Sequence, residues 1–212
     1  MMPQLKNSDP NIVWLKESKD FTVFLSEYIK RPGLGIIDFP HKRMVIISQS
    51  KEYMIIVDLI EGKGKKLIEQ IFHLDCKKIN DVDNGVELEH KNQVLSLLSF
   101  SNEKLNTEIT ERYFSSYYGK IEKKPVIVFK SKSKLPIAIC SIISPNNAKD
   151  IDATIKFEKL NMIKLFLKMK DKVESEINFN IEISKNDMKP IIIKNGKEIK
   201  LSNKKIGNNY EK

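Results

Sequence analysis

The chain has 212 residues, of which 41% are hydrophobic and 31% charged, with 37 basic against 28 acidic side chains. Only 8 glycines exclude a collagen-like repeat, and 2 cysteines exclude a disulfide scaffold. Uncharged apolar runs are short, as at 135–145, and fall well below the ~20 residues of a spanning helix. We therefore expect a globular chain with one sizeable core and no membrane contact.

The N-terminal decapeptide MMPQLKNSDP lacks the basic region and apolar stretch of a secretory signal. As written, the chain is therefore expected to stay in the cytoplasm. If the true N-terminus lies further upstream, we expect the periplasm instead.

The formal net charge of +9 comes almost entirely from lysine, because arginine occurs only at Arg31, Arg43 and Arg112. The basic residues are spread along the chain and form no block. Nucleic-acid binders cluster their charge and use arginine forks, so we do not expect nucleic acid as a partner. The pattern favours a lysine-rich solvated surface, and the functional alternative is attraction to an anionic polysaccharide.

In chain order, residues 17–30 are the one segment with helical character, although Phe21, Val23 and Leu25 also alternate as in a strand. The segments that follow read as strands separated by Gly, Asn, Lys and Pro turns. They cover residues 44–48, 53–60, 67–74, 94–99, 125–129 and 137–143.

The C-terminal third alternates most clearly. Apolar residues at odd positions in 163–169 and 177–183 predict two strands, each with one dry face, joined across 171–176. Asn195-Gly196 is the strongest short hairpin signal, and a two-residue loop there sets Ile192 opposite Ile199.

Strands at short spacing without intervening helices predict an all-β fold, an antiparallel β-sandwich. We expect a lead-in over 1–24, one sandwich domain over 25–201 and a disordered tail over 202–212.

One group of residues on neighbouring predicted strands has side chains that could bind a metal. If the first hairpin turns across 49–52, Arg43 opposes Asp58, and His41 lies diagonally across from the same carboxylate. If the loop EGKGKK has an even length, His73 on the next strand shares this face, whereas a one-residue slip sends it to the other face. Two imidazoles and a carboxylate from three adjacent strands form a ligand set that Zn²⁺ accepts.

A structural interpretation stands beside the metal. Asp58 can simply pair with Arg43 across the hairpin, and His73 can be a core histidine. His90 lies in a polar stretch and is expected to be an exposed loop residue. Cys76 and Cys140 have no partner at metal-ligand spacing and are expected to be buried, reduced thiols.

The phosphate-binding, nucleophile-elbow and zinc-protease motifs GxGxxG, GxxxxGK[ST], GxSxG and HExxH are absent from the sequence. The aromatic stretch ERYFSSYYGK, residues 111–120, is typical of a strand end with core rings. Its functional interpretation is an edge on which sugar rings stack.

Two segments resemble the C-terminal β-sandwich region of the heparinase II/III-like polysaccharide lyases. HKRMVIISQSKEYMIIVDLIEGKGKKLIEQIFHLD, residues 41–75, is similar to the family's His-x-Arg strand, its strand ending in Val-Asp, its Gly-x-Gly turn and its strand ending in His-Leu. SSYYGKIEKKPVIVFKSKSKLPIAICSIISP, residues 115–145, is similar to the Ser-x-Tyr-Gly segment and the closing Leu-Pro strand.

The resemblance implies a bacterial enzyme that cleaves uronic-acid glycans, such as glycosaminoglycans or alginate, by β-elimination. It implies an N-terminal helical toroid followed by the sandwich. It also implies a structural zinc ion, which maps onto His41, Asp58 and His73. Arg43 and Tyr118 are then expected to contact substrate or support the metal ligands.

The chain departs from the family in three respects. It lacks the toroid, it has no Tyr between Asp58 and His73, and Phe39 and Pro40 stand where some members carry a catalytic His. We therefore assign no catalytic residue and expect a lyase portion that is inactive alone and forms one wall of the substrate cleft. The alternative is a non-catalytic glycan-binding or scaffolding sandwich. If His41, Asp58 and His73 point to opposite sides of the sheet, we expect neither the zinc site nor the relationship to this family to hold.

Overall fold

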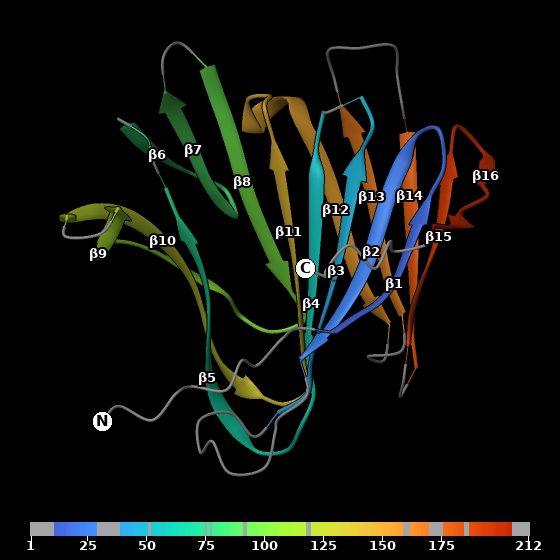
Figure 1. The fold of residues 1–212 in the computed structure, drawn as a ribbon, viewed down its shortest axis with the longest axis horizontal. Helices are drawn as coiled ribbons and strands as arrows, with labels where there is room; N and C mark the ends of the chain where they lie inside the picture. Colours follow the sequence, from blue (N-terminus) through green and yellow to red (C-terminus); the bar gives the residue numbers. More distant parts are fainter. Residues whose placement is uncertain are drawn as a thin grey trace, which may run out of the picture.

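The computed structural model describes residues 11–28, 39–50, 52–74, 76, 78–90, 93–117, 120–158, 162–169, 176–184 and 187–204. Within these ranges the chain forms seventeen strands and one short 3₁₀ turn, Ala148–Asp150, and it contains no α-helix (Figure 1). The all-β prediction is therefore confirmed. No helix in these ranges has the length and apolarity of a membrane span.

The largest sheet has nine strands and is antiparallel throughout. Its order in space is β17 (Ser202–Asn203), β1 (Asn11–Glu17), β2 (Phe21–Tyr28), β3 (His41–Ser48), β4 (Met54–Ile60), β11 (Ile137–Ser144), β8 (Gln93–Ser101), β7 (Gly85–His90) and β6 (Lys78–Val82).

Two smaller sheets accompany it (Figure 1). The five-stranded sheet has the order β12 (Ile151–Glu158), β13 (Met162–Met169), β14 (Glu176–Ile183), β15 (Met188–Lys194) and β16 (Lys197–Ile199). The three-stranded sheet has the order β5 (Lys65–His73), β10 (Lys120–Lys134) and β9 (Asn106–Tyr117).

The main core lies between the nine-stranded and five-stranded sheets. Strand alternation sends every second side chain into it, as Phe21, Val23 and Leu25 do from β2. Phe179 of β14 meets the Phe21 ring edge-on from the opposite layer, with 5.9 Å between the ring centroids. These two layers are the predicted sandwich.

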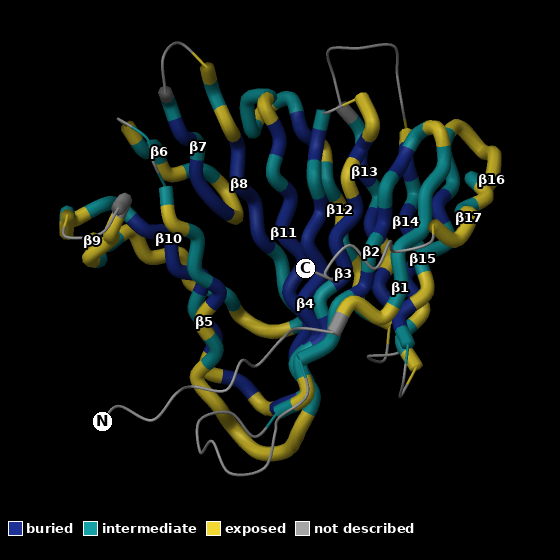
Figure 2. Tube along the Cα trace, viewed as in Figure 1, coloured by how far each residue is buried: buried dark blue, intermediate teal, exposed yellow. Residues whose placement is uncertain are grey.

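The other face of the nine-stranded sheet carries a second, smaller core. Val86, Leu88 and Leu97 on this face pack against Ile127 and Phe129 of β10. The nine-stranded sheet is thus a middle layer, buried on both faces where β8, β11 and β4 run (Figure 2). A polar side chain in this region can be buried even when it points away from the main core.

The two predicted C-terminal pairings are confirmed. β13 and β14 pair antiparallel with their buried odd residues on one face. Ile192 lies opposite Ile199, and the turn between them has positive φ at both Asn195 (50°) and Gly196 (74°). Most of the connection over 171–176 lies outside the described residues.

Three expectations about the first residues and the tail are corrected. The possible helix over 17–30 is wrong, because Phe21–Tyr28 is the strand β2, paired along its whole length with β3. The predicted boundary at residue 25 falls inside this strand, and β1 lies within the expected lead-in. Ser202 and Asn203, in the expected tail, pair with β1.

Candidate functional site

The site is built on the hairpin of β3 and β4. The Ser48 amide donates to the Tyr53 carbonyl at 3.1 Å and closes the turn. This register sets Arg43 opposite Asp58, as predicted, and the alternation of β3 puts His41 on the face that carries Arg43. The face is the one turned away from the main core.

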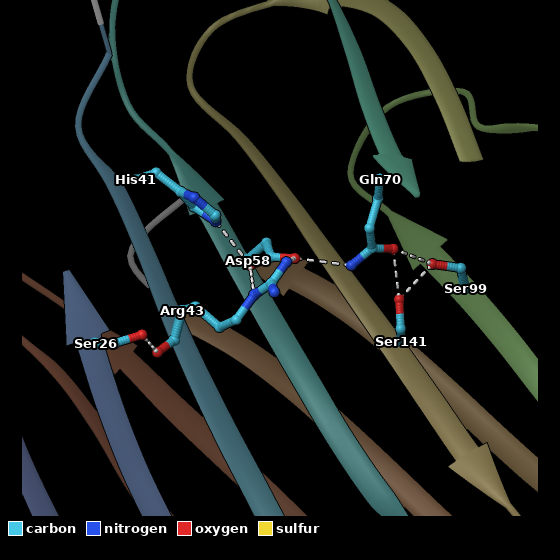
Figure 3. A network of polar contacts seen from close by, with 7 residues as sticks. All are labelled: Ser26, His41, Arg43, Asp58, Gln70, Ser99 and Ser141. Carbon is cyan, nitrogen blue, oxygen red and sulfur yellow. Dashed lines mark hydrogen bonds and ion pairs between the residues drawn. The ribbon is translucent and has the colours of Figure 1, made fainter. Parts of the chain in front are cut away.

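Asp58 is the centre of the site. Its residue is 2% exposed. Arg43 grips the carboxylate with two donors, Nε to Oδ1 at 2.6 Å and Nη2 to Oδ2 at 2.8 Å, and His41 Nε2 lies 2.7 Å from Oδ1 (Figure 3). The ion pair between Arg43 and Asp58, the structural alternative to a metal site, is therefore present.

A glutamine from another sheet completes the site. Gln70 of β5 donates its Nε2 hydrogen to Asp58 Oδ2 at 2.8 Å, and its Oε1 accepts hydrogen bonds from Ser141 at 2.7 Å and Ser99 at 3.2 Å (Figure 3). The two serine hydroxyls are also 2.7 Å apart. This network joins the three-stranded sheet to the nine-stranded sheet. Gln70 is not among the residues predicted from the sequence, although a glutamine inside the apolar run LIEQIFHL is a signal of a buried polar contact.

The electrostatics of Asp58 follow from these contacts. Burial alone raises the pKa of the carboxyl group, but the hydrogen bonds from His41 and Arg43 and the positive charge of Arg43 outweigh it, so the pKa lies below its ordinary value. The hydrogen bond to Asp58 raises the pKa of Arg43 against the effect of its own partial burial. Asp58 is thus a carboxylate at neutral pH.

The cationic side of the site reaches the surface. The Arg43 side chain is 42% exposed and that of His41 33% exposed, while Asp58 beneath them is 3% exposed. An arginine oriented by a buried carboxylate keeps donors for a second, external anion. Chemically, the arrangement can bind an anion at a fixed position.

His73 does not join the cluster, which corrects the predicted trio. β5 does not pair with β4, because the chain crosses after Glu61 into the three-stranded sheet, where His73 lies opposite Val126. Gln70 points at Asp58, and His73, three residues on, lies on the other face of the strand. The exposed His73 ring lies near the Phe114 ring, tilted by 41° with 6.4 Å between the centroids. Both registers considered in the sequence assumed that β5 pairs with β4, so neither is observed.

This arrangement does not fit the predicted three-ligand zinc centre. The described residues include all three predicted ligands, and they form no group of three or more His, Cys, Asp or Glu side chains that could hold a metal. Both oxygens of Asp58 are already engaged by donors, Oδ1 by His41 and Arg43 and Oδ2 by Arg43 and Gln70.

We predict that metal removal leaves the fold unchanged, because the positive charge that balances Asp58 comes from Arg43. Dialysis against EDTA should leave the melting temperature and the circular dichroism spectrum as they were. Metal analysis of the purified chain should find zinc below stoichiometry. One equivalent of bound zinc that is lost in His41→Ala and retained in His90→Ala would contradict this prediction.

The other predicted residues lie apart from the site. Tyr118 lies outside the described residues. His90 ends the strand β7, which corrects its expected loop position. Neither cysteine takes part in a disulfide. Cys140 is buried, which raises the pKa of its thiol to about 12, whereas Cys76 is only partly buried.

The aromatic stretch over 111–120 differs from a strand end with core rings. Tyr113 is 73% exposed and Phe114 37% exposed, on the β9–β10 ribbon. Lys123 lies over the Tyr113 ring at 5.7 Å from its centroid. The two rings are therefore exposed and do not belong to the core, and sugar stacking on them stays a prediction.

Known proteins resemble this chain in fold but show little sequence identity to it. No family model and no curated protein matches the chain. A solved heparinase III aligns with a TM-score of 0.64 at 18% identity, over 84% of this chain and 28% of that chain. Heparan sulfate lyase HepC from Pedobacter heparinus aligns with a TM-score of 0.63 at 16% identity, over 87% of this chain and 28% of the enzyme.

This chain shares its fold with part of heparinase III. A further heparinase III structure agrees, with a TM-score of 0.64 at 14% identity over 84% of this chain. The chain spans little more than a quarter of the length of these enzymes. The heparinase-like β-sandwich predicted from the sequence is thus supported as a fold, and the activity of the whole enzymes belongs to the proposal below.

Proposed function

We propose that this chain is the β-sandwich portion of a heparinase-like polysaccharide lyase and that Arg43 and His41 contact an anionic, uronate-containing glycan. The observation that carries the proposal is the exposed guanidinium of Arg43, held in place by the buried Asp58 carboxylate. The fold shared with heparinase III supports the substrate class, and so does the formal net charge of +9.

The chemistry of β-elimination explains why such a contact is useful. The reaction removes a proton next to a uronate carboxylate and expels the neighbouring ring substituent, so the carboxylate must be neutralised while a base and an acid act. Arg43 uses Nε and Nη2 on Asp58, and no described residue engages Nη1. In this proposal Arg43 binds the uronate carboxylate of the glycan and neutralises its charge through Nη1.

The acid and base come, in this proposal, from a helical toroid elsewhere in a longer protein or in a partner chain. The described site holds one imidazole and no tyrosine beside the carboxylate, so it makes an incomplete set for proton transfer. The apolar side chains Val13 and Ile47, at 44% and 36% exposure, lie on the nine-stranded sheet and are available to a covering domain. We therefore expect glycan binding without turnover by this chain alone.

We predict that Arg43→Gln weakens the binding of a heparan sulfate octasaccharide about tenfold, the loss of one charge-assisted hydrogen bond to an anion. Isothermal titration calorimetry at fixed ionic strength measures the change. Arg112→Gln is the matched control, because the Arg112 side chain is 41% exposed and is also paired with an acid, Glu69. Equal losses in the two variants would indicate only diffuse charge attraction and would refute the assigned contact.

The alternative, a non-catalytic glycan-binding sandwich, is favoured by the exposed ring of Tyr113 beside Lys123. Absorbance of the unsaturated uronate product separates the two functions, measured with heparan sulfate and alginate after the toroid-bearing partner or the full-length protein is added. Product formation supports the lyase, and binding without product supports the alternative. A steep salt-dependent affinity for nucleic acid alone would contradict both.

A further inference from the structure

The strand β12 leaves one edge of the five-stranded sheet open. Within the described part of the chain it pairs only with β13, in a regular eight-residue register from Ile151 to Glu158. It contains no proline and no bulge. An edge of this kind presents a row of unpaired backbone N–H and C=O groups to anything extended that fits beside it.

A groove follows this open edge. A hollow of about 690 Å³ lies between the start of β12, at Ile151 and Ala153, and the turn around Asn84. A second hollow, of about 220 Å³, continues along Ile155 and Phe157. Both hollows are lined by Asn84 and Phe100, so they form one path along nearly the whole strand.

The nine-stranded sheet forms one wall of the groove. Its strands β8, β7 and β6 extend past β12, as Figure 1 shows, and they direct Leu98 and Phe100 toward the groove. A sixth strand beside β12 would sit at the normal strand spacing of about 4.8 Å and beneath a layer about 10 Å away. Its alternate side chains would then meet Leu98 and Phe100.

We propose that this groove binds an extended peptide segment, with alternating apolar and basic residues, that adds to β12 as a sixth strand. The charge of the lining selects the basic residues. Asp83, Glu87 and Asp152 line the larger hollow, in a chain of formal net charge +9. Lys149 is the only cation among the described residues that line it. Glu103 lines the smaller hollow.

A second copy of this chain does not fit the groove. Antiparallel pairing of β12 with β12 of another copy would make one continuous sheet with both nine-stranded sheets on the same side. That side is already occupied by β6, β7 and β8, so the two sheets would collide. A single strand from a separate segment avoids this collision. The proposal is independent of the glycan function, which uses the opposite face of the nine-stranded sheet.

The test uses the full chain and a fluorescein-labelled heptapeptide, Lys-Val-Lys-Val-Lys-Val-Lys, in fluorescence anisotropy at physiological salt. We expect saturable one-to-one binding that the double variant Asp83→Lys with Asp152→Lys weakens at least tenfold. Both positions are exposed, so the variant should fold. Glu182→Lys, an exposed acid in the same five-stranded sheet but outside the groove, should change the affinity less than twofold.

The backbone contribution has its own control. The same heptapeptide N-methylated at its three valines keeps its charge and side chains but loses donors along one edge, and it should bind at least tenfold more weakly. Equal affinity for the two peptides would show a purely electrostatic contact and overturn the proposal. Absence of saturable binding, or equal losses in Glu182→Lys and the groove variant, would also overturn it.

Discussion

Asp58→Ala is expected to lower the free energy of unfolding by about 3 kcal/mol and the melting temperature by about 10 °C. The substitution removes the acceptor for Arg43, His41 and Gln70 together. Arg43 and His41 can turn toward water, but Gln70 is 6% exposed and its amide donor is left unpaired in the interior. Thermal unfolding followed by circular dichroism measures the change.

The matched control for Asp58→Ala is Asp152→Ala, which alters an exposed aspartate on a strand. It should leave the melting temperature nearly unchanged, as surface substitutions usually do. A melting temperature for Asp58→Ala that equals the wild-type value would contradict the network in Figure 3. Separately, Gln70→Leu tests whether the link between the two sheets requires the amide.

Acid should weaken the fold through the same carboxylate. The folded-state pKa of Asp58 is depressed, so its contribution to stability is complete above the unfolded value of about 3.9 and is lost as pH falls through the folded value. Below about pH 4 the wild-type stability should therefore fall more steeply than that of Asp58→Asn, which cannot titrate at this position. Urea unfolding at a series of pH values gives the two slopes.

Phe179→Ala is expected to destabilise the fold by about 4 kcal/mol, the cost of a large cavity in a close-packed core. Phe179 is fully buried in the main core, where its ring meets Phe21 at 5.9 Å and Tyr53 at 6.4 Å between centroids. These contacts tie the five-stranded sheet to the nine-stranded sheet. Chemical denaturation with urea provides the free energy directly.

Phe114→Ala is the control for this second prediction. Phe114 has the same side chain but is 37% exposed on β9, so its loss removes much less buried area and should cost well under half as much. Equal losses of unfolding free energy in Phe114→Ala and Phe179→Ala would mean that the Phe114 ring is buried as deeply as the Phe179 ring. That result would contradict the layer assignment.

The fold likeness to heparinase III holds although the predicted metal ligands do not converge. We expected zinc and kinship to fail together if His41, Asp58 and His73 did not converge. The trio is split, yet the fold likeness stands, because it depends on strand order and pairing across most of the chain. The three strands are consecutive in the sequence, but only β3 and β4 are adjacent in space.

Local pattern alone determined much of this protein. Period-two alternation identified β13 and β14, the Asn195-Gly196 dipeptide set the register of the last hairpin, and a short turn placed Arg43 opposite Asp58. Each of these contacts joins strands that are neighbours in the sequence, so spacing and turn chemistry suffice to predict them.

Only the tertiary structure decided the rest. The partner of β5 is β10, which follows it by nearly fifty residues, and no turn signal specifies so distant a pairing. That pairing turned Gln70 toward Asp58 and His73 away from it, and so made the site an arginine-held carboxylate. The open edge of β12 likewise arises because the nine-stranded sheet is wider than the sheet packed against it, a property of the assembled layers that no single segment encodes.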